Sequence, residues 1–205
     1  MKVYIWADME GVAGVTDWDD PVTDTHFNAE TRARMRKLFT EEVNSAVEGA
    51  LAAGAQSVLV RDAHGLGNNL YVEQLHPEAE VILGLKGLPN PWPDLDESFA
   101  AALIVGAHPM AGTPRGILPH TMYEVNGRRM GDAGLFAAVC GSYDVPIAMA
   151  SGDQAALDQL SELMPGLRTA AVKQAYSPYA IRTFPPAKAR RMIRAAAEDG
   201  LRNLE

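Results

Sequence analysis

Short apolar runs alternate with longer segments of helical periodicity along this chain. Residues 3–7, 57–60 and 101–107 are apolar runs bounded by turn-forming or polar residues, a pattern typical of strands buried on both faces. Between them, residues 28–53 carry apolar side chains at helical spacing, with Gly54 placed to end the helix. This alternation predicts strands joined by crossover helices.

The remaining elements follow the same rhythm. Asn126-Gly127, flanked by short runs of strand-forming residues, is a strong β-hairpin signal. Pro and Gly in residues 86–96 predict an irregular surface loop. Beyond the segments already named, we expect strands at 80–83, 146–150 and 168–172, hairpin strands at 122–125 and 129–130, and helices at 132–143, 154–163 and 187–204.

These elements predict an α/β fold with a mostly parallel central sheet flanked by helices and a β-hairpin insertion. With 205 residues and 47% hydrophobic content, the chain can bury a sizeable core, so we expect one domain over residues 1–205. The chain stops inside a predicted helix.

Charge and cysteine content narrow the class of protein. The net charge of -8 argues against nucleic acid or an anionic membrane as a partner. No apolar run approaches the ~20 residues of a membrane span, and the N-terminal run is too short for a signal peptide. Cys140 lies in an apolar helical stretch, so we expect a buried, inert thiol. The expected location is the cytoplasm.

Acidic and imidazole side chains follow the predicted strands at the point where each ends. Asp8 and Glu10 follow the first strand, Asp62 and His64 the second, and His108 the strand at 101–107. Ligands bind outside the carboxyl ends of strands in open α/β sheets, so these side chains are expected to converge. Carboxylates and imidazoles together suit zinc or a similar divalent ion, which predicts a metalloenzyme.

Several residues keep two interpretations. Asp62 is either a direct ligand or a carboxylate that orients the neighbouring imidazole. His120 is a general acid or base, an oxyanion-stabilising group, or an ordinary loop residue. Asp132 is first a charge at a helix N-terminus and second a ligand, and Asp153 is an N-cap or an acid that supports a metal ligand.

The two other histidines have simpler interpretations. His26 lies in a polar loop, and His76 precedes Pro77 in a turn. For both, we expect a solvated or capping role.

Several motifs in fixed order resemble one known family. They include Asp8-Met9-Glu10-Gly11-Val12, residues 60–64 with 68–70, residues 75–79, Gly106 with His108, residues 131–135 and residues 171–174. Together they resemble the zinc-dependent D-aminopeptidases encoded with dipeptide transport systems, the DppA-like peptidases, over essentially the whole chain.

The resemblance implies a site with two zinc ions. In this sequence Asp8 would bridge both ions, Glu10 and His64 would complete one site, and His108 with Asp132 the other. His120 matches the histidine proposed for catalysis. The implied reaction is hydrolysis of short peptides from the free N-terminus by a zinc-bound hydroxide, with D-amino acid peptides as the implied substrates. A ring-like homo-oligomer with an enclosed chamber is also implied, with the Trp92 loop as a contact.

The sequence departs from the family at two places. The helix-borne ligand of the family is a glutamate, whereas Asp132 is one methylene shorter. Family members also continue into further sheet and helix beyond the position of Glu205, so a C-terminal extension is expected to be lacking.

Two alternatives stay open. A binuclear metallophosphoesterase would also use Asp-x-His after a strand, although its Gly-Asp-x-x-Asp and Gly-Asn-His elements are absent. A non-catalytic, metal-stabilised homo-oligomer is the second alternative.

Overall fold

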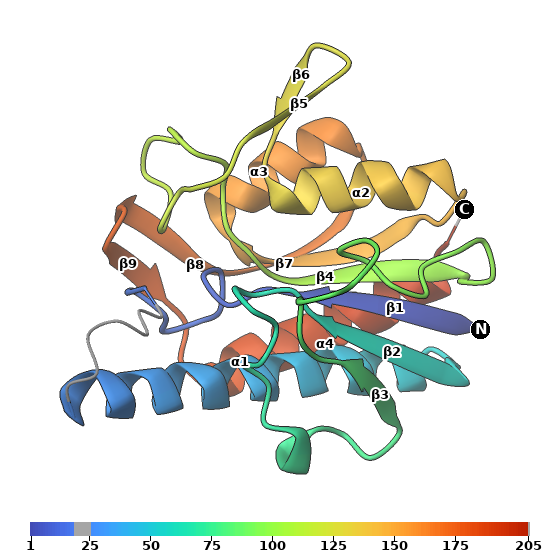
Figure 1. The fold of residues 1–205 in the computed structure, drawn as a ribbon, viewed down its shortest axis with the longest axis horizontal. Coiled ribbons are helices and arrows are strands. Elements are labelled where there is room, and N and C mark those ends of the chain that lie inside the picture. The colour runs from blue at the N-terminus through green and yellow to red at the C-terminus, as the bar shows by residue number, and fades with distance from the viewer. Residues whose placement is uncertain (19–25, 205) are drawn as a thin grey trace.

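A computed structural model describes residues 1–18 and 26–204, and a seven-stranded sheet forms their centre (Figure 1). The strand order is β3-β2-β1-β4-β7-β8-β9, and all neighbours are parallel except the antiparallel pair β8 and β9. This arrangement confirms the predicted α/β class. The strands are β1 (Lys2–Ala7), β2 (Ser57–Asp62), β3 (Ala79–Ile82), β4 (Ala101–Ala107), β7 (Ile147–Asp153), β8 (Arg168–Ser177) and β9 (Ala180–Thr183).

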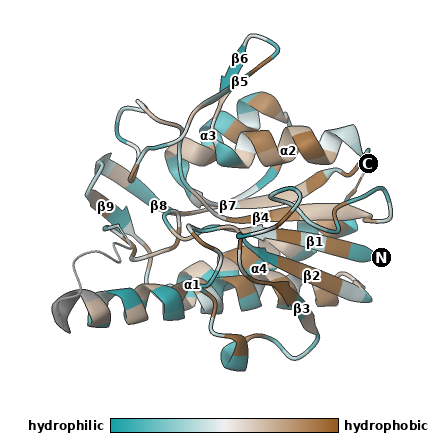
Figure 2. Ribbon diagram, viewed as in Figure 1, coloured by the Kyte–Doolittle hydropathy of each residue, from teal (hydrophilic) through white to brown (hydrophobic). Residues whose placement is uncertain are grey.

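Helices cover both faces of the sheet (Figure 1). On one face lie α1 (His26–Ala52) and α4 (Pro186–Arg202), and on the other α2 (Asp132–Ser142) and α3 (Gln154–Leu163). Figure 2 shows hydrophobic and hydrophilic residues interspersed along α1, as expected for a helix with one buried face.

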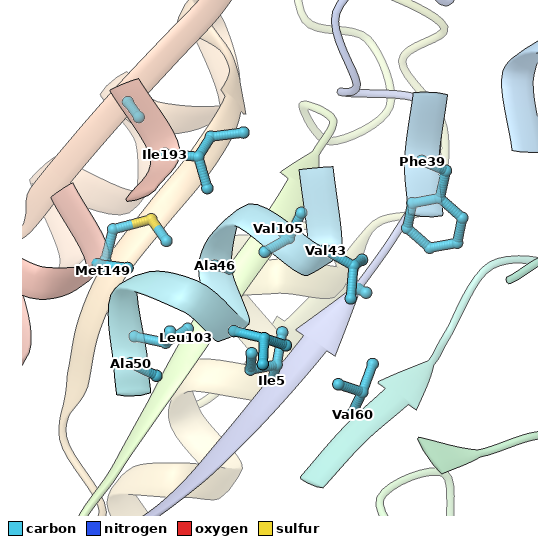
Figure 3. Close-up of a cluster of buried hydrophobic side chains, with 14 of the residues drawn as sticks. Ile5, Phe39, Val43, Ala46, Ala50, Val60, Leu103, Val105, Met149 and Ile193 are labelled. Carbon is cyan, nitrogen blue, oxygen red and sulfur yellow. The ribbon is translucent and has the colours of Figure 1, made fainter. Parts of the chain in front are cut away.

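The apolar side of α1 forms a core with the central strands. In Figure 3, Val43, Ala46 and Ala50 of α1 lie close to Ile5 of β1 and Leu103 of β4, all fully buried. The apolar spacing that predicted the helix is therefore the surface that packs on the sheet. None of the described helices is long and apolar enough to cross a membrane.

The predicted hairpin is confirmed. β5 (Tyr123–Val125) pairs antiparallel with β6 (Arg128–Met130). The connecting residues Asn126 and Gly127 have φ values of 52° and 78°, as the turns that favour this dipeptide require.

Two parts of the fold differ from the sequence-based expectation. β9 was not predicted, because only Ile181 of its residues is partly buried and the segment lacks an alternating pattern. The short 3₁₀ helix η1 (Val72–Gln74), which lies between β2 and β3, was also not predicted.

The strand order reverses at β1, because β2 and β3 lie on one side of it and β4 and β7 on the other. β1 lies between β2 and β4, so segments that leave these strands meet at one edge of the sheet. There Gly106 has a φ of +75°, and a Cβ atom at this position would lie 1.9 Å from the carbonyl oxygen of Asp8. Only glycine permits this close approach of two backbones.

We expect Gly106→Ala to destabilise the protein by about 3 kcal/mol or more, since it adds a backbone clash to the strain of a left-handed conformation. Gly112→Ala is the matched control, because its φ is +79° but no atom lies within 4 Å of the added Cβ. We expect that control to cost about 1–2 kcal/mol. Urea denaturation of both variants measures the difference, and equal losses would contradict the role of the close approach.

Candidate metal centre

The ends of β1, β2 and β4 bring four of the expected ligands together. Asp8 and Glu10 follow β1, His64 follows β2 and His108 follows β4, and all four are buried. The fifth, Asp132, is the first residue of α2 and is partly exposed. Three strands and one helix thus supply the cluster.

Three of these side chains form one group of donor atoms. His64 Nδ1 lies 2.9 Å from Glu10 Oε2 and 3.2 Å from Asp8 Oδ1. One imidazole nitrogen therefore faces two carboxylates.

A second group lies on the other side of Asp8. His108 Nε2 lies 3.3 Å from Asp8 Oδ2 and 3.2 Å from Asp132 Oδ2. The two oxygens of Asp8 thus face two different imidazoles. The shorter side chain of Asp132 still reaches His108.

The spacing of the donor atoms fits zinc. Two ligands bound at the usual zinc distances and a tetrahedral angle lie about 3.4 Å apart. The nitrogen–oxygen distances of 2.9–3.3 Å in both groups are close to that separation. The mixture of carboxylate and imidazole donors is also one that zinc accepts.

Backbone carbonyls orient two of the imidazoles. His108 Nδ1 donates to the carbonyl oxygen of Pro109 at 3.0 Å, which leaves Nε2 free for a metal. His120 Nδ1 donates to the carbonyl oxygen of Leu118 at 2.8 Å, which leaves its Nε2 free to accept a proton. Each hydrogen bond selects the tautomer that the site would use.

His120 lies beside the ligands and is partly exposed. Its ring stacks on His108 with centroids 3.9 Å apart, and its Nε2 lies 3.7 Å from Glu10 Oε1. Donor atoms of His108, His120 and Asp132 also lie within 4.8 Å of one another. His120 is thus near enough to act on a bound substrate or to bind a metal itself.

Burial and mutual attraction set the charges of the cluster. Burial and the neighbouring charge of Glu10 raise the pKa of Asp8 to about 6. Burial also raises the pKa of Glu10, but the charge of His64 and its hydrogen bond outweigh this and hold that pKa well below its usual range.

The pKa values of both imidazoles are raised by the neighbouring carboxylates. Burial lowers the pKa of His64, but the Glu10 charge and hydrogen bonds to Asp8 and Glu10 raise it to about 11. Burial likewise lowers the pKa of His108, but the hydrogen bond to Asp132 and the charges of Asp8 and Glu10 raise it to about 9. A divalent cation would take the place of these imidazole protons.

Asp62 organises the loop after β2 and makes no hydrogen bond to the imidazole of His64. Its oxygens accept from the backbone of Asn69 at 2.6 Å, the backbone of Leu70 at 2.9 Å and the Asn69 amide at 3.0 Å. The Asn69 amide in turn donates to the carbonyl oxygen of His64 at 2.6 Å. The expectation that Asp62 orients the ring directly is wrong, because β2 ends at Asp62 and the chain turns before His64.

Asp153 supports the loop that carries His120. Its side chain is fully buried and makes no cap hydrogen bond to α3. It accepts instead from the backbone of Ile117 at 3.2 Å and of Ala175 at 3.1 Å. The acid thus connects the His120 loop to β8, away from the donor cluster.

The remaining predicted residues lie elsewhere. His76 Nδ1 accepts from the backbone of Glu78 at 3.2 Å, which is the expected turn role. His26 begins α1, and its side chain lies outside what the structure describes. Cys140 is buried as expected, and burial raises the pKa of its thiol to about 12, which disfavours the reactive thiolate.

Sequence reasoning missed two buried charged residues that bind the loop after β1. Lys173 of β8 donates to the carbonyl oxygens of Glu10, of Val12 at 2.8 Å and of Val15 at 2.8 Å. Glu42 of α1 accepts from the backbone of Ala13 at 3.0 Å. For Lys173 the available signal was a charged residue directly after the strand predicted at 168–172, inside a motif quoted for the family resemblance.

A cavity of about 480 Å³ opens beside the cluster. The donor residues Asp8, Glu10, His64 and Asp132 line it together with His120. Its other walls are mainly apolar or aromatic and include Trp6, Leu85, Pro91, Trp92, Tyr123 and Leu135. The Trp92 ring faces inward, with its centroid 6.3 Å from that of Phe136.

Comparisons with known proteins agree with this site. The model of the D-aminopeptidase family, peptidase family M55, matches residues 1–205. A D-aminopeptidase of Bacillus subtilis (strain 168) is 40% identical over 209 residues, which cover 99% of this chain and 74% of that protein.

A solved structure has the same fold. The Zn-dependent D-aminopeptidase DppA from Bacillus subtilis, described as a self-compartmentalizing protease, matches with a TM-score of 0.90 and 39% identity. The match covers 99% of this chain and 74% of that chain. The resemblance predicted from the motifs is thereby confirmed, and the chain belongs to the D-aminopeptidase family.

Proposed function

We propose that this protein is a zinc-dependent D-aminopeptidase that removes the N-terminal residue of short peptides and holds two zinc ions per subunit. The observation that carries the proposal is the carboxylate of Asp8, whose two oxygens face His64 on one side and His108 on the other. A carboxylate shared in this way suits a pair of cations a few ångströms apart.

Each ligand has a defined place in the proposed centre. Asp8 would be shared by the two ions, Glu10 and His64 would hold one of them, and His108 and Asp132 would hold the other. When bound, the two ions supply a water of lowered pKa and polarise the scissile carbonyl. The separation of these donors from solvent strengthens every electrostatic interaction with the substrate.

His120 is the group proposed to move protons during hydrolysis. The backbone hydrogen bond to Leu118 is made by Nδ1, and Nε2 has no backbone partner among the described residues. The ring lines the cavity beside Asp8 and Glu10. His120 is therefore placed to stabilise the tetrahedral intermediate or to protonate the leaving amine.

Membership of the D-aminopeptidase family favours peptide hydrolysis over phosphoester hydrolysis. The non-catalytic alternative gains no support from Asp132, because this shorter acid lies 3.2 Å from His108. We further propose that residues 1–205 form a single domain in the cytoplasm. Self-association into a ring is proposed by analogy with the relative described as self-compartmentalizing.

Alanine variants of the histidines separate the metal ligands from the proton-transfer residue. We expect His64→Ala and His108→Ala to lose bound zinc and peptidase activity together, since each removes an imidazole donor. We expect His120→Ala to keep the zinc content of the wild type while kcat falls about 100- to 10,000-fold. Metal analysis and hydrolysis of D-Ala-D-Ala measure both quantities.

His76→Ala is the control, because His76 lies in a surface turn and should leave both quantities unchanged. Full zinc content in His64→Ala would contradict the ligand assignment. Equal hydrolysis of D-Ala-D-Ala and L-Ala-L-Ala would contradict the chirality alone, and hydrolysis of a phosphoester but no peptide would contradict the proposed reaction.

Zinc binding should displace the protons of His64 and His108. With pKa values of about 11 and 9, His64 and His108 carry protons at pH 7 in the metal-free protein. Zinc binding should therefore release roughly two protons per subunit at pH 7 and become tighter as pH rises toward 9–11. Calorimetric titration in buffers of different ionisation enthalpy measures the release, and a heat independent of buffer would contradict the charge assignment.

In the metal-free protein, the free energy of unfolding contributed by these imidazoles should fall as pH rises. Their pKa values are raised above the ordinary 6.5, so their contribution is fully present below pH 6.5. It is lost as pH rises through 9 to 11. Denaturation of the chelator-treated protein between pH 6 and pH 10 should show this decline, and zinc should remove it.

Lys173→Met tests the loop that follows β1. Lys173 is fully buried and binds three of its carbonyl groups, so Lys173→Met should destabilise the protein by about 3–5 kcal/mol and weaken zinc binding through Glu10. Lys37→Met, on the exposed side of α1, is the control and should change stability by less than about 0.5 kcal/mol. Urea denaturation and zinc titration would show the loop assignment to be wrong if both variants behaved alike.

A further inference from the structure

Arg61 is a buried cation in the wall of the cavity beside the metal centre. It lies on β2 opposite Trp6 of β1, so both side chains project from the same face of the sheet. It is 2% exposed and is the largest fully buried side chain among the described residues. Both residues line the cavity that also borders Asp8, Glu10 and His64.

The partners of Arg61 are neutral. Nε donates to the carbonyl oxygen of Pro91 at 3.1 Å, and Nη1 donates to Ile82 at 3.3 Å and to Gly84 at 2.8 Å. A guanidinium has five N–H donors, so the two on Nη2 remain. Among the residues that the structure describes, Nη2 has no hydrogen-bond partner and no carboxylate lies within 4.0 Å of Arg61.

A buried guanidinium with no acid in contact is costly. Burial lowers the pKa of Arg61, and the charges of Tyr4 and Asp62 only partly oppose this. The adjacent carboxylate of Asp62 is already bound by Asn69 and Leu70 on the other side of β2. Arg61 thus lines the cavity while the two N–H groups of Nη2 have no partner among the described residues. An anionic ligand would compensate the charge, and each Nη2 N–H group can donate a charge-assisted hydrogen bond to a carboxylate oxygen.

The distance from the metal centre suits a short peptide. Arg61 pairs with Trp6 of β1, which precedes Asp8 by two positions. The backbone of Asp8 and the backbone of Arg61 are therefore offset by about 7 Å along the strand direction. One extended peptide residue spans about 3.5 Å. A peptide of two or three residues with its scissile bond at the metal centre would bring its C-terminus near Arg61.

We propose that Arg61 binds the C-terminal carboxylate of the peptide substrate and makes the enzyme selective for short peptides with a free acid. This inference rests on the proposed peptidase function and adds a specificity residue to it. Pro91 and Trp92 line the cavity beside Arg61, and the low exposure of the guanidinium strengthens its interaction with a bound carboxylate.

The test compares D-Ala-D-Ala with its C-terminal amide. For the zinc-loaded wild type, we expect kcat/KM to be about 10- to 100-fold higher for the free acid, the range of a charge-assisted contact. Arg61→Met should reduce that ratio to about one, mainly through a loss on the free acid. The ratio is independent of the fraction of folded enzyme, because both substrates meet the same preparation.

Two further variants guard against a purely structural effect. Arg61→Lys keeps the charge and should retain an intermediate ratio, whether or not the loop contacts to Pro91 and Gly84 survive. Arg36→Met is the matched control, since Arg36 also donates to backbone carbonyls, those of Asn68 and Asn69 at 2.8 Å, but does not line this cavity. Its ratio should equal that of the wild type.

The outcomes are distinct. Equal cleavage of acid and amide by the wild type, or an unchanged ratio in Arg61→Met, would overturn the role of Arg61 while the peptidase function stood. A ratio lost equally in Arg61→Met and Arg36→Met would also overturn it. If zinc-loaded wild type cleaved neither substrate, the proposed function itself would fail.

Discussion

The carboxylate of Asp8 is the group on which the organisation of the site depends. Its oxygens face His64 and His108, and its carbonyl oxygen packs against Gly106. The position of β1 between β2 and β4 makes all three contacts available at once. A buried acid is stable only where opposite charges or a metal compensate its charge. The sheet topology supplies that compensation, because it places His64 and His108 on either side of Asp8.

Much of this could be predicted from the sequence. The strands that carry the cluster are mainly apolar, so both their existence and the convergence of their ends follow from local pattern and the geometry of parallel sheets. The role of Asp62 could not be predicted, because alternation holds only while a strand continues and β2 ends there. β9 was missed because an exposed edge strand leaves little hydrophobic pattern.

Sequence reasoning did not identify the contacts of Lys173 and Asp153, and both residues act on backbone groups. Lys173 binds the carbonyl groups of the loop after β1, and Asp153 binds the amide groups of Ile117 and Ala175. Nothing in composition or spacing identifies which loop a buried charge will meet. These contacts hold the segments that carry Glu10 and His120, so the precision of the cluster depends on charges that do not belong to it.

Arg61 would give the cavity a second fixed contact for the substrate beside the metal centre. Asp8, Glu10 and Asp132 line the cavity together with Arg61, and the strand register places Arg61 opposite Trp6, two positions before Asp8. Two divalent cations would offset the charge of the three carboxylates, so the metal centre would hold the scissile bond rather than repel a carboxylate. The guanidinium of Arg61 would hold the C-terminal carboxylate. Only a short peptide in one orientation reaches both contacts, so together they would select the direction and the length of the substrate.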